Sequence, residues 1–361
     1  MSILSPTSSV SALFPHREKF PSDDTVFPIS WYPIAWASQL KDKPVKRRVV
    51  GRDVVVYRDS KGQIHALEAY CAHRGADLSL GKCVADGIQC AYHGWQFNAE
   101  GHCTKIPAHP NRPIPEFAKI RAYPVQERAG LIWIYPDDLD VPPDLKLFSE
   151  LEQPELVLVP YEQTWKAHLT RVVESVLDVA HLAFVHKSTI GKRLSEEIKL
   201  VDFDVQEQNQ IVIRNGGGLL EYQFPQQWIL RPSTPSKSQF INYVTFCPVD
   251  SDTTIIFGYA GRTFLRKMPF MNPIFRRYSL KVLTEDKAVV ESQHPRPIPE
   301  ALRMEAHVPA DGPQVRFRQR WFQFLASEEP RIILHPGSSQ PEKTGGQVVG
   351  EPHAPSSHTL S

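Results

Sequence analysis

The chain has 361 residues, of which 41% are hydrophobic and 22% are charged. These fractions are typical of globular proteins and exclude a chain that is disordered throughout. Its 41 Lys and Arg residues balance 40 Asp and Glu residues, so the formal net charge of +1 provides no global field to attract nucleic acid or an anionic membrane. The 32 prolines favour a loop-rich and β-rich structure over a helical bundle.

The sequence predicts a cytoplasmic protein without a membrane span. No apolar run approaches the ~20 residues that a helix needs to cross a bilayer. The first residues, Met1–Pro15, have neither the basic nor the apolar segment of a signal peptide. An odd number of cysteines, five, argues against a disulfide framework in a cytosolic chain.

Short strands are expected in the first part of the chain, after a Ser- and Pro-rich arm at residues 1–27 that we expect to be flexible. Residues 48–58 are typical of two strands around a Gly-Arg-Asp turn, and residues 63–68 alternate as a further strand. Residues 28–140 are therefore predicted to form a small all-β domain. The Pro- and Asp-rich segment 136–143 is typical of a linker.

Beyond this linker the pattern changes to a mixture of strands and helices. Residues 199–261 alternate as strands. Apolar residues recur at spacings of three and four along three segments that we expect to be helical: 168–185, 279–292 and 314–325. We expect a second domain over residues 141–326, followed by a disordered Gly-, Pro- and Ser-rich tail at residues 327–361.

Two segments of the predicted β domain each offer one thiolate and one imidazole, Cys71 with His73 and Cys90 with His93. Zinc accepts two Cys and two His, but zinc fingers usually group Cys with Cys and His with His. A Rieske 2Fe-2S centre needs one Cys and one His from each of two loops, because two Cys bind one iron and two His bind the other. A zinc knuckle and an accidental cluster are the alternatives to a Rieske centre.

The sequences Cys-Ala-His-Arg-Gly-Ala-Asp-Leu, from Cys71, and Cys-Ala-Tyr-His-Gly-Trp-Gln-Phe, from Cys90, resemble the cluster-binding loops of the Rieske family. The resemblance implies that Cys71, His73, Cys90 and His93 bind the cluster. Rieske proteins of cytochrome complexes usually carry additional cysteines within these loops, and this chain has none at the corresponding places. The oxygenase or ferredoxin branch is therefore favoured, and a ferredoxin would end near residue 138.

A second group of polar residues falls within the predicted helix 168–185 and just after it. Asp178 and His181 are three residues apart and share a helical face, but His181 and His186 are about 140° apart on an ideal helix. The two imidazoles can bind one metal only if the helix tightens, bulges or ends near Phe184, so we expect a π-bulge or a helix end there. The alternative is a buried helix with two hydrogen-bonded histidines.

The pattern Glu174-x3-Asp178-x2-His181-x4-His186 resembles the iron-binding motif of Rieske non-haem iron oxygenases. The resemblance implies that His181 and His186 are two ligands of a 2-His-1-carboxylate iron site. It also implies that Asp178 links an iron-bound His to a cluster-bound His of the neighbouring subunit. Glu174, one turn earlier, would line the same path.

The third iron ligand would be a carboxylate from a distant segment, with Glu285, Asp286 and Glu291 as candidates. The segment Glu-Asp-Lys-Ala-Val-Val-Glu at residues 285–291 resembles the ligand-bearing helix of vanillate and dicamba demethylases, and this resemblance implies Asp286. The alternative is a solvated charged face.

Together these resemblances imply the oxygenase (alpha) component of a Rieske system with an α+β fold. An all-β Rieske domain would precede a helix-grip, START-like catalytic domain built on an antiparallel sheet. Fe(II), supplied with electrons by the cluster, would use O2 to hydroxylate or O-demethylate an organic, aromatic or cyclic, substrate. The enzyme would be a monooxygenase or a ring-hydroxylating dioxygenase.

Electrons from NAD(P)H would reach the protein through a separate reductase or ferredoxin, because the sequence has neither a GxGxxG fingerprint after a strand nor a P-loop. The family also implies a homotrimer, since its cluster and iron lie too far apart within one chain. The rival interpretation is a Rieske electron-transfer protein fused to a non-catalytic START-like ligand-binding domain. The oxygenase would hold one iron atom more per chain.

Overall fold

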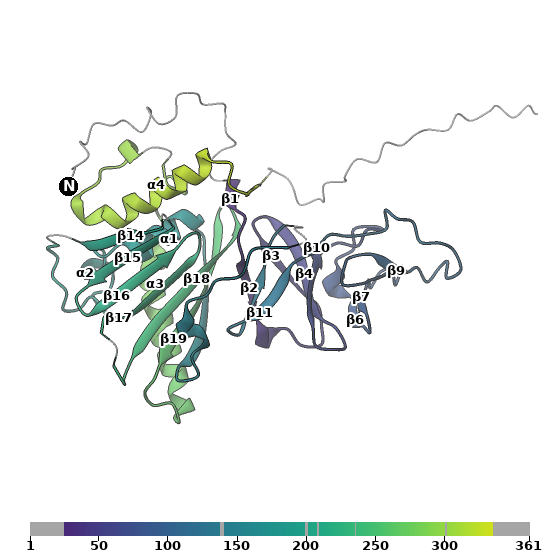
Figure 1. The fold of residues 1–361 in the computed structure, drawn as a ribbon, viewed down its shortest axis with the longest axis horizontal. Helices are drawn as coiled ribbons and strands as arrows, with labels where there is room; N and C mark the ends of the chain where they lie inside the picture. The colour runs from purple at the N-terminus through teal and green to yellow at the C-terminus, as the bar shows by residue number, and fades with distance from the viewer. Residues whose placement is uncertain are drawn as a thin grey trace, which may run out of the picture.

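The computed structural model describes residues 25–137, 141–198, 201–207, 209–234, 236–299 and 302–334. Two lobes lie side by side along the long axis of the molecule (Figure 1). The N-terminal lobe consists of short strands, and the C-terminal lobe combines a large antiparallel sheet with helices. The predicted α+β class is therefore confirmed. None of the helices in the described part of the chain is long and apolar enough to cross a membrane.

The N-terminal lobe contains three small antiparallel sheets. The first has the order β11 (Val125–Arg128), β12 (Leu131–Ile134), β2 (Tyr32–Trp36). The second has the order β10 (Ala122–Tyr123), β5 (Ile64–Glu68), β4 (Arg52–Arg58), β3 (Val45–Val49). The third, at the far end of the lobe, is formed by β6 (Lys82–Val84), β7 (Gly87–Gln89), β8 (Gln96–Phe97) and β9 (Cys103–Lys105).

The predicted hairpin at residues 48–58 is confirmed as β3 and β4, with its turn at Val50 and Gly51. Both turn residues have positive φ, 41° and 73°, as a type I′ hairpin turn requires. The turn therefore lies slightly before the Gly-Arg-Asp triplet expected from the sequence.

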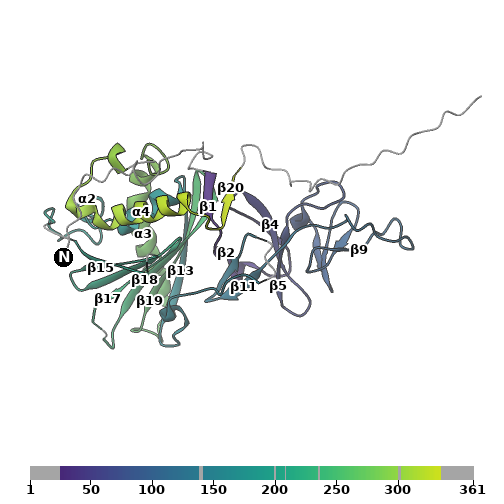
Figure 2. The same ribbon diagram turned by 45° about the horizontal axis from the view of Figure 1, so that its top comes forward.

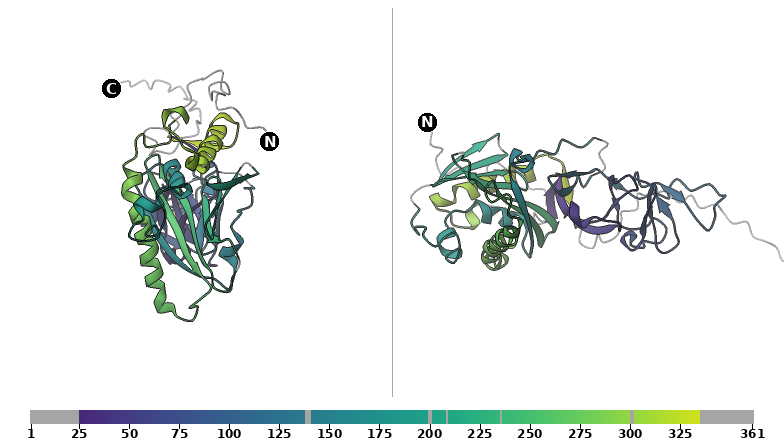
Figure 3. Two further views of the ribbon diagram at one scale, coloured as in Figure 1. Left: turned by 90° about the vertical axis from the view of Figure 1, so that its left-hand side faces the viewer. Right: turned by 90° about the horizontal axis from the view of Figure 1, so that it is seen from below.

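The C-terminal lobe is built on a seven-stranded sheet in which neighbouring strands are antiparallel. Its order is β13 (Val157–Trp165), β19 (Thr253–Arg262), β18 (Phe240–Asp250), β17 (Gln227–Pro232), β16 (Gly218–Gln223), β15 (Gln210–Asn215), β14 (Asp202–Gln206). The helices are α1 (Leu169–Leu177), α2 (Leu182–Val185), α3 (Asn272–Glu291) and α4 (Gly312–Ala326). Helix α1 packs on β18 and β19 and contacts both α3 and α4, and Figure 3 shows α3 running along the side of the sheet.

Two segments of the C-terminal lobe differ from the sequence-based prediction. Periodicity predicts one helix over 168–185, whereas α1 ends at Leu177 and α2 is a separate single turn. Helix α3 begins at Asn272, seven residues before the start at residue 279 that the periodicity predicts. Pro273 fits the first turn of α3 because its fixed φ suits a helix start and no N–H is needed there.

The two ends of the described chain pair with each other where the lobes meet. Strand β1 (Val26–Pro28) is antiparallel to β20 (Arg331–Ile333), and the two lie side by side in Figure 2. Phe27 and Ile332, in the middle of these strands, are buried. These strands fall inside or at the edge of the ranges expected to be an arm, 1–27, and a tail, 327–361, so ordered structure extends further at both ends than expected. Burial of apolar side chains stabilises this short pair. Residues 1–24 and 335–361 lie outside the described residues.

One apolar core runs through both lobes and joins them. It contains Tyr32 and Trp133 from the three-stranded sheet together with Trp165 and Phe246 from the large sheet, all fully buried. A second, separate core lies under the end of the N-terminal lobe and includes Cys71 and Cys90. The boundary predicted near residue 140 is thus crossed by packing, and the division into domains 28–140 and 141–326 stays a prediction.

A buried network of charges ties α1 to α4. Arg171 donates to Glu174 (3.1 Å) and to Glu305 (2.8 Å), and Arg318 donates to the same two carboxylates. Both arginines and Glu174 are at least nine-tenths buried, so each charge depends on its partners. Partial burial alone would raise the pKa of Glu305, but the two arginines outweigh it and lower that pKa to about 2.

We expect Glu305→Gln to destabilise the protein by roughly 1–3 kcal/mol at pH 7, because two buried guanidinium groups lose a charged acceptor. A carboxyl whose folded-state pKa is lowered contributes stability above its ordinary pKa, 4.5, and loses it as the pH falls towards about 2. The difference between the variant and the wild type in urea unfolding should therefore be constant from pH 7 to 5 and shrink below 4.5. An equal difference at pH 3 and pH 7 would contradict this role.

Candidate metal centres

Cys71 and Cys90 begin two loops with the same backbone hydrogen bonds. The amide of Cys71 donates to the carbonyl of Ala76, and that of Cys90 donates to Trp95, in each case five residues ahead (2.9 and 2.8 Å). The glycine four residues after each cysteine returns a hydrogen bond to the cysteine carbonyl. Gly75 has a φ of 66° and Gly94 a φ of 72°, a left-handed conformation that glycine adopts without steric cost.

The four predicted cluster ligands meet between these loops in two layers. The thiols of Cys71 and Cys90 are buried, whereas His73 is half-buried and His93 is exposed. The two imidazole rings have centroids 4.6 Å apart, and the ring of His73 stacks on Trp95. Among the described residues, Nδ1 of His73 is buried without a hydrogen-bond partner, as expected of a nitrogen that binds a metal.

The electrostatics of this pair of thiols also suit a bound cation. Burial and the neighbouring Cys90 together raise the pKa of Cys71 to about 12, because burial disfavours the thiolate and two thiolates would repel each other. A metal charge stabilises thiolates at such a site, since the thiolate is the form that coordinates. Two buried sulfurs below two more exposed imidazoles therefore fit a 2Fe-2S cluster with Cys on one iron and His on the other.

The second group of candidate ligands depends on the interruption between α1 and α2. At Asp178 the backbone becomes extended, with φ −81° and ψ 128°. Its carboxylate accepts the amide N–H groups of Ala180 (2.7 Å) and His181 (3.3 Å), which a continuous helix would bond to its own carbonyls. The helix end expected near Phe184 is confirmed, since α2 ends at Val185 and His186 leaves the helix.

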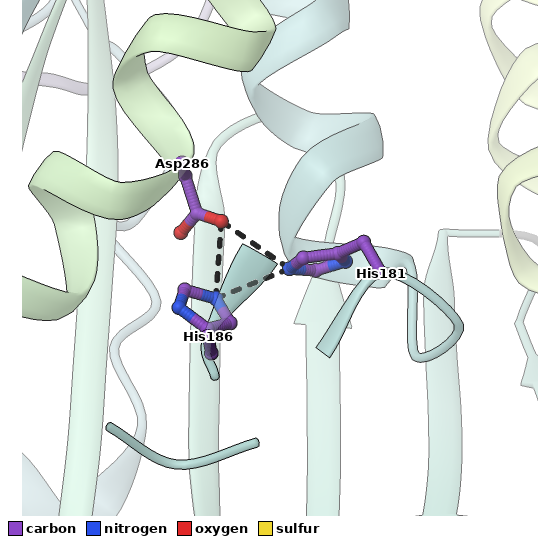
Figure 4. A group of neighbouring side chains, drawn as sticks. All are labelled: His181, His186 and Asp286. Atoms are coloured by element: carbon purple, nitrogen blue, oxygen red, sulfur yellow. Dashed lines mark hydrogen bonds and ion pairs between the residues drawn. The ribbon is translucent and has the colours of Figure 1, made fainter. Parts of the chain in front are cut away.

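This geometry brings two imidazoles and one carboxylate to a single point (Figure 4). Nε2 of His181 lies 3.3 Å from Nε2 of His186. Oδ1 of Asp286, from α3, lies 3.3 Å from the first nitrogen and 3.0 Å from the second. A 2-His-1-carboxylate set of this kind is the ligand set of non-haem Fe(II) oxygenases, which leaves coordination positions open.

The other two carboxylates considered from the sequence point elsewhere. Glu285 lies 2.9 Å from Nδ1 of His186, on the far side of that ring from Asp286. Glu291 accepts the backbone N–H of Lys166 at 2.6 Å. Of the three candidates, Asp286 is thus the residue whose position fits the third ligand.

Carboxylates surround the two imidazoles closely enough to keep a proton on them. Burial alone would lower the pKa of His181, but Asp178 and Asp286 outweigh it and raise that pKa to about 9. The same contacts lower the pKa of Asp286 in spite of its burial. Because a metal binds the neutral imidazole, a divalent cation at this point would replace that proton.

A cavity of about 220 Å³ lies beside His181 and Asp286. Asp178 and Glu174, the two residues predicted to lie on the path of electrons, both line it. The carboxylate of Glu174 belongs to the charge network, whereas Asp178 is 30% exposed. Sequence reasoning missed the arginines that line this cavity, Arg171 and Arg318, because no local pattern sets their partners.

Comparisons with known proteins match a family to each lobe. The Rieske 2Fe-2S domain family matches residues 30–124, and the C-terminal domain family of the vanillate O-demethylase oxygenase matches 165–216 and 219–327. The chain is 30% identical over 316 residues to methylxanthine N1-demethylase NdmA of Pseudomonas putida, covering 82% of this chain and 88% of that protein. It is 36% identical over 154 residues to the 5,5'-dehydrodivanillate O-demethylase oxygenase subunit of a Sphingobium species, covering 41% of this chain and 33% of the relative.

Solved structures give the same result for the fold. The structure of NdmA from Pseudomonas putida CBB5 has a TM-score of 0.71 at 28% identity, covering 85% of this chain and 96% of that one. Dicamba monooxygenase bound to dicamba has the same TM-score at 24% identity, covering 82% and 97%, a likeness of fold. A match to an oxygenase domain in the second lobe excludes the rival interpretation of an electron carrier fused to a non-catalytic domain. This chain therefore belongs to the Rieske non-haem iron oxygenases and is an oxygenase component, in which a Rieske cluster fed by a separate reductase passes electrons to a mononuclear iron that uses O2 to hydroxylate or demethylate an organic substrate.

Proposed function

We propose that His181, His186 and Asp286 hold the mononuclear iron and that the two loops beginning at Cys71 and Cys90 hold the Rieske cluster. The observation that carries this assignment is the approach of two Nε2 atoms and one carboxylate oxygen to within 3.3 Å of each other, from segments a hundred residues apart in sequence. Burying the Asp286 carboxylate costs free energy unless an opposite charge lies beside it. A cation bound by all three side chains explains the arrangement.

The substrate is an aromatic or heterocyclic compound that carries a methyl group on nitrogen or oxygen. Relatives named as an N1-demethylase of methylxanthines and an O-demethylase of dehydrodivanillate support this class. Demethylation of this kind is hydroxylation of the methyl carbon, after which the unstable product loses formaldehyde. Electrons come from NAD(P)H through the separate reductase or a ferredoxin, and the predicted cytoplasmic location agrees with that supply.

The working unit is a homotrimer in which the cluster of one chain lies against the iron site of the next. Within one chain the cluster loops lie at the end of the N-terminal lobe, and α1 and α2 lie in the other lobe (Figures 1 and 2). A head-to-tail contact that closes as a ring brings the two centres together. Leu80 and Tyr92, which belong to the segments that follow Cys71 and Cys90, are exposed apolar side chains and suit such a contact.

Asp178 connects the two centres across this interface. It lines the cavity beside the iron site, and its carboxylate lies 3.8 Å from Nδ1 of His181. The exposed side of this carboxylate accepts the N–H of a cluster-bound histidine of the adjacent chain, with His93 as the more exposed of the two candidates. Glu174 supports the same wall of the cavity through its two arginines.

Cys71→Ser should abolish the visible absorption of the cluster while the C-terminal lobe stays folded, because the core around Cys71 is separate from the main core. Cys103→Ser is the matched control, since Cys103 is buried in the same small core but lies outside the two loops. Absorption spectroscopy and circular dichroism test both variants. A wild-type spectrum in Cys71→Ser would contradict the ligand assignment.

Asp286→Ala should remove the mononuclear iron and all product formation while the cluster spectrum is unchanged. Losing a ligand weakens binding by more than the roughly 10–100-fold that follows loss of an outer hydrogen-bond partner. Iron analysis per chain measures the effect, with Glu291→Ala as a control on the same helix. Full iron in Asp286→Ala together with its loss in Glu291→Ala would show that the third ligand is misassigned.

Asp178→Asn should keep both metal centres and the trimer but slow turnover by roughly 10–100-fold, because a neutral amide lacks the charge and the second acceptor oxygen with which the carboxylate orients the imidazoles of the two centres. Light scattering measures the oligomer, and single-turnover absorption follows cluster oxidation against product formation. A fully active monomer, or a variant with wild-type coupling between the two, would overturn the proposed interface.

A further inference from the structure

His186 is held from both sides of its ring. Its Nε2 faces Asp286 at 3.0 Å, and its Nδ1 lies 2.9 Å from Oε2 of Glu285. A neutral imidazole that coordinates a metal through one nitrogen carries its single proton on the other. With a metal bound at Nε2, Nδ1 would donate to Glu285, and this hydrogen bond would set both the tautomer and the orientation of the ring.

Glu285 is itself fixed by the chain that follows His186. The hydroxyl of Ser188 donates to Oε1 of Glu285, and the hydroxyl of Thr189 donates to Oε2 at 2.5 Å. Both carboxylate oxygens are thus engaged in hydrogen bonds. The side chain cannot turn towards the position of Asp286 without giving up all three hydrogen bonds.

The turn that supplies these hydroxyls is held against the end of α2 by backbone hydrogen bonds. The amides of Thr189 and Gly191 both donate to the carbonyl of His186, each at 2.9 Å. A Cβ atom at Gly191 would lie 1.9 Å from the carbonyl oxygen of Leu182, so glycine is required for the chain to pass there. The short segment 186–191 therefore carries a candidate ligand together with the two groups that hold its carboxylate partner.

The other imidazole is held less firmly. Nδ1 of His181 lies 3.8 Å from Asp178, beyond hydrogen-bond distance, and within the described residues it has no hydrogen-bond partner. Asp178 uses one carboxylate oxygen for the backbone amides of the helix break. The His181 side chain is 19% exposed, against 2% for His186. One ligand is thus anchored in the protein interior and the other faces the cavity.

We propose that Glu285 is a positioning residue that makes His186 the fixed ligand of the iron site. It touches neither the substrate nor the metal position and acts through the His186 ring, which it orients and makes a stronger donor. His181, with its looser partner, is the ligand free to adjust when the adjacent chain engages Asp178. This inference rests on the proposed iron site and adds a residue for which the sequence suggested only a possible ligand role.

The test compares Glu285→Ala, Glu285→Gln and Glu291→Ala in the cluster-loaded, full-length protein. Fe(II) affinity of the mononuclear site and the electron paramagnetic resonance spectrum of its nitric oxide complex are measured. Glu285→Ala should weaken Fe(II) binding by roughly 10–100-fold and change the anisotropy of the spectrum. Glu285→Gln keeps an oxygen that accepts from Nδ1, so it should restore most of the affinity. Glu291→Ala removes the same charge from the same helix and should behave as the wild type.

Three results would overturn the inference. Wild-type affinity and spectrum in Glu285→Ala would show that Glu285 does not act through His186. An equal loss in Glu291→Ala would reveal a general charge effect, and a Gln variant as weak as the Ala variant would exclude orientation by hydrogen bonding. Failure of the wild type itself to bind Fe(II) would instead overturn the proposed iron site.

If Glu285→Ala does not fold, the Ser188→Ala/Thr189→Ala double variant should show a smaller loss of Fe(II) affinity in the same direction. An unchanged affinity in that double variant would count against the proposal.

Discussion

A continuous α-helix cannot direct His181 and His186 at one metal, because five residues turn the second side chain about 140° away from the first. The break at Asp178 resolves this constraint. Its carboxylate accepts the amide N–H groups of Ala180 and His181, which follow the end of α1, and the chain restarts as a single turn that ends at Val185. The convergence of the proposed iron ligands, and with it the position of α3 beside them, depends on this interruption.

The surroundings of the break carry charges that would be unfavourable if each stood alone. Arg171 and Arg318 form ion pairs with Glu174 and Glu305. The two histidines contact Asp286, and His186 also contacts Glu285. A buried charge is costly without a partner, so each of these groups restrains the position of the next. The cavity between the two sets is therefore polar and firmly bounded, and it gives access to the candidate iron ligands from the surface.

The two centres have different relations to the fold. The cluster loops lie on their own small core, and their backbone hydrogen bonds are local. The proposed iron site is assembled by helices that pack on the large sheet, whose core continues into the N-terminal lobe. The cluster loops depend only on local contacts, so they can bind another chain without disturbing the rest of the fold. The iron ligands are held in place by helix packing. This contrast suits the proposed transfer of electrons from one chain to the next.

The sequence by itself determined the features that are local. Three such features could be predicted, because each depends on neighbours within a few residues. They are the spacing of Cys71, His73, Cys90 and His93, the strand alternation of 199–261 and the need for a helix end near Phe184. The break at Asp178 was not, since the apolar period continues through it and side-chain capping decides. Only the family resemblance favoured Asp286 over Glu285 and Glu291 as the third ligand. Successive residues of a helix point about 100° apart, and the packing of α3 on α1 and β13 decides which of them faces the histidines. The partners of Glu285 and Glu174 were likewise decided only by the tertiary structure, because their donors come from distant turns and helices that no local pattern brings together.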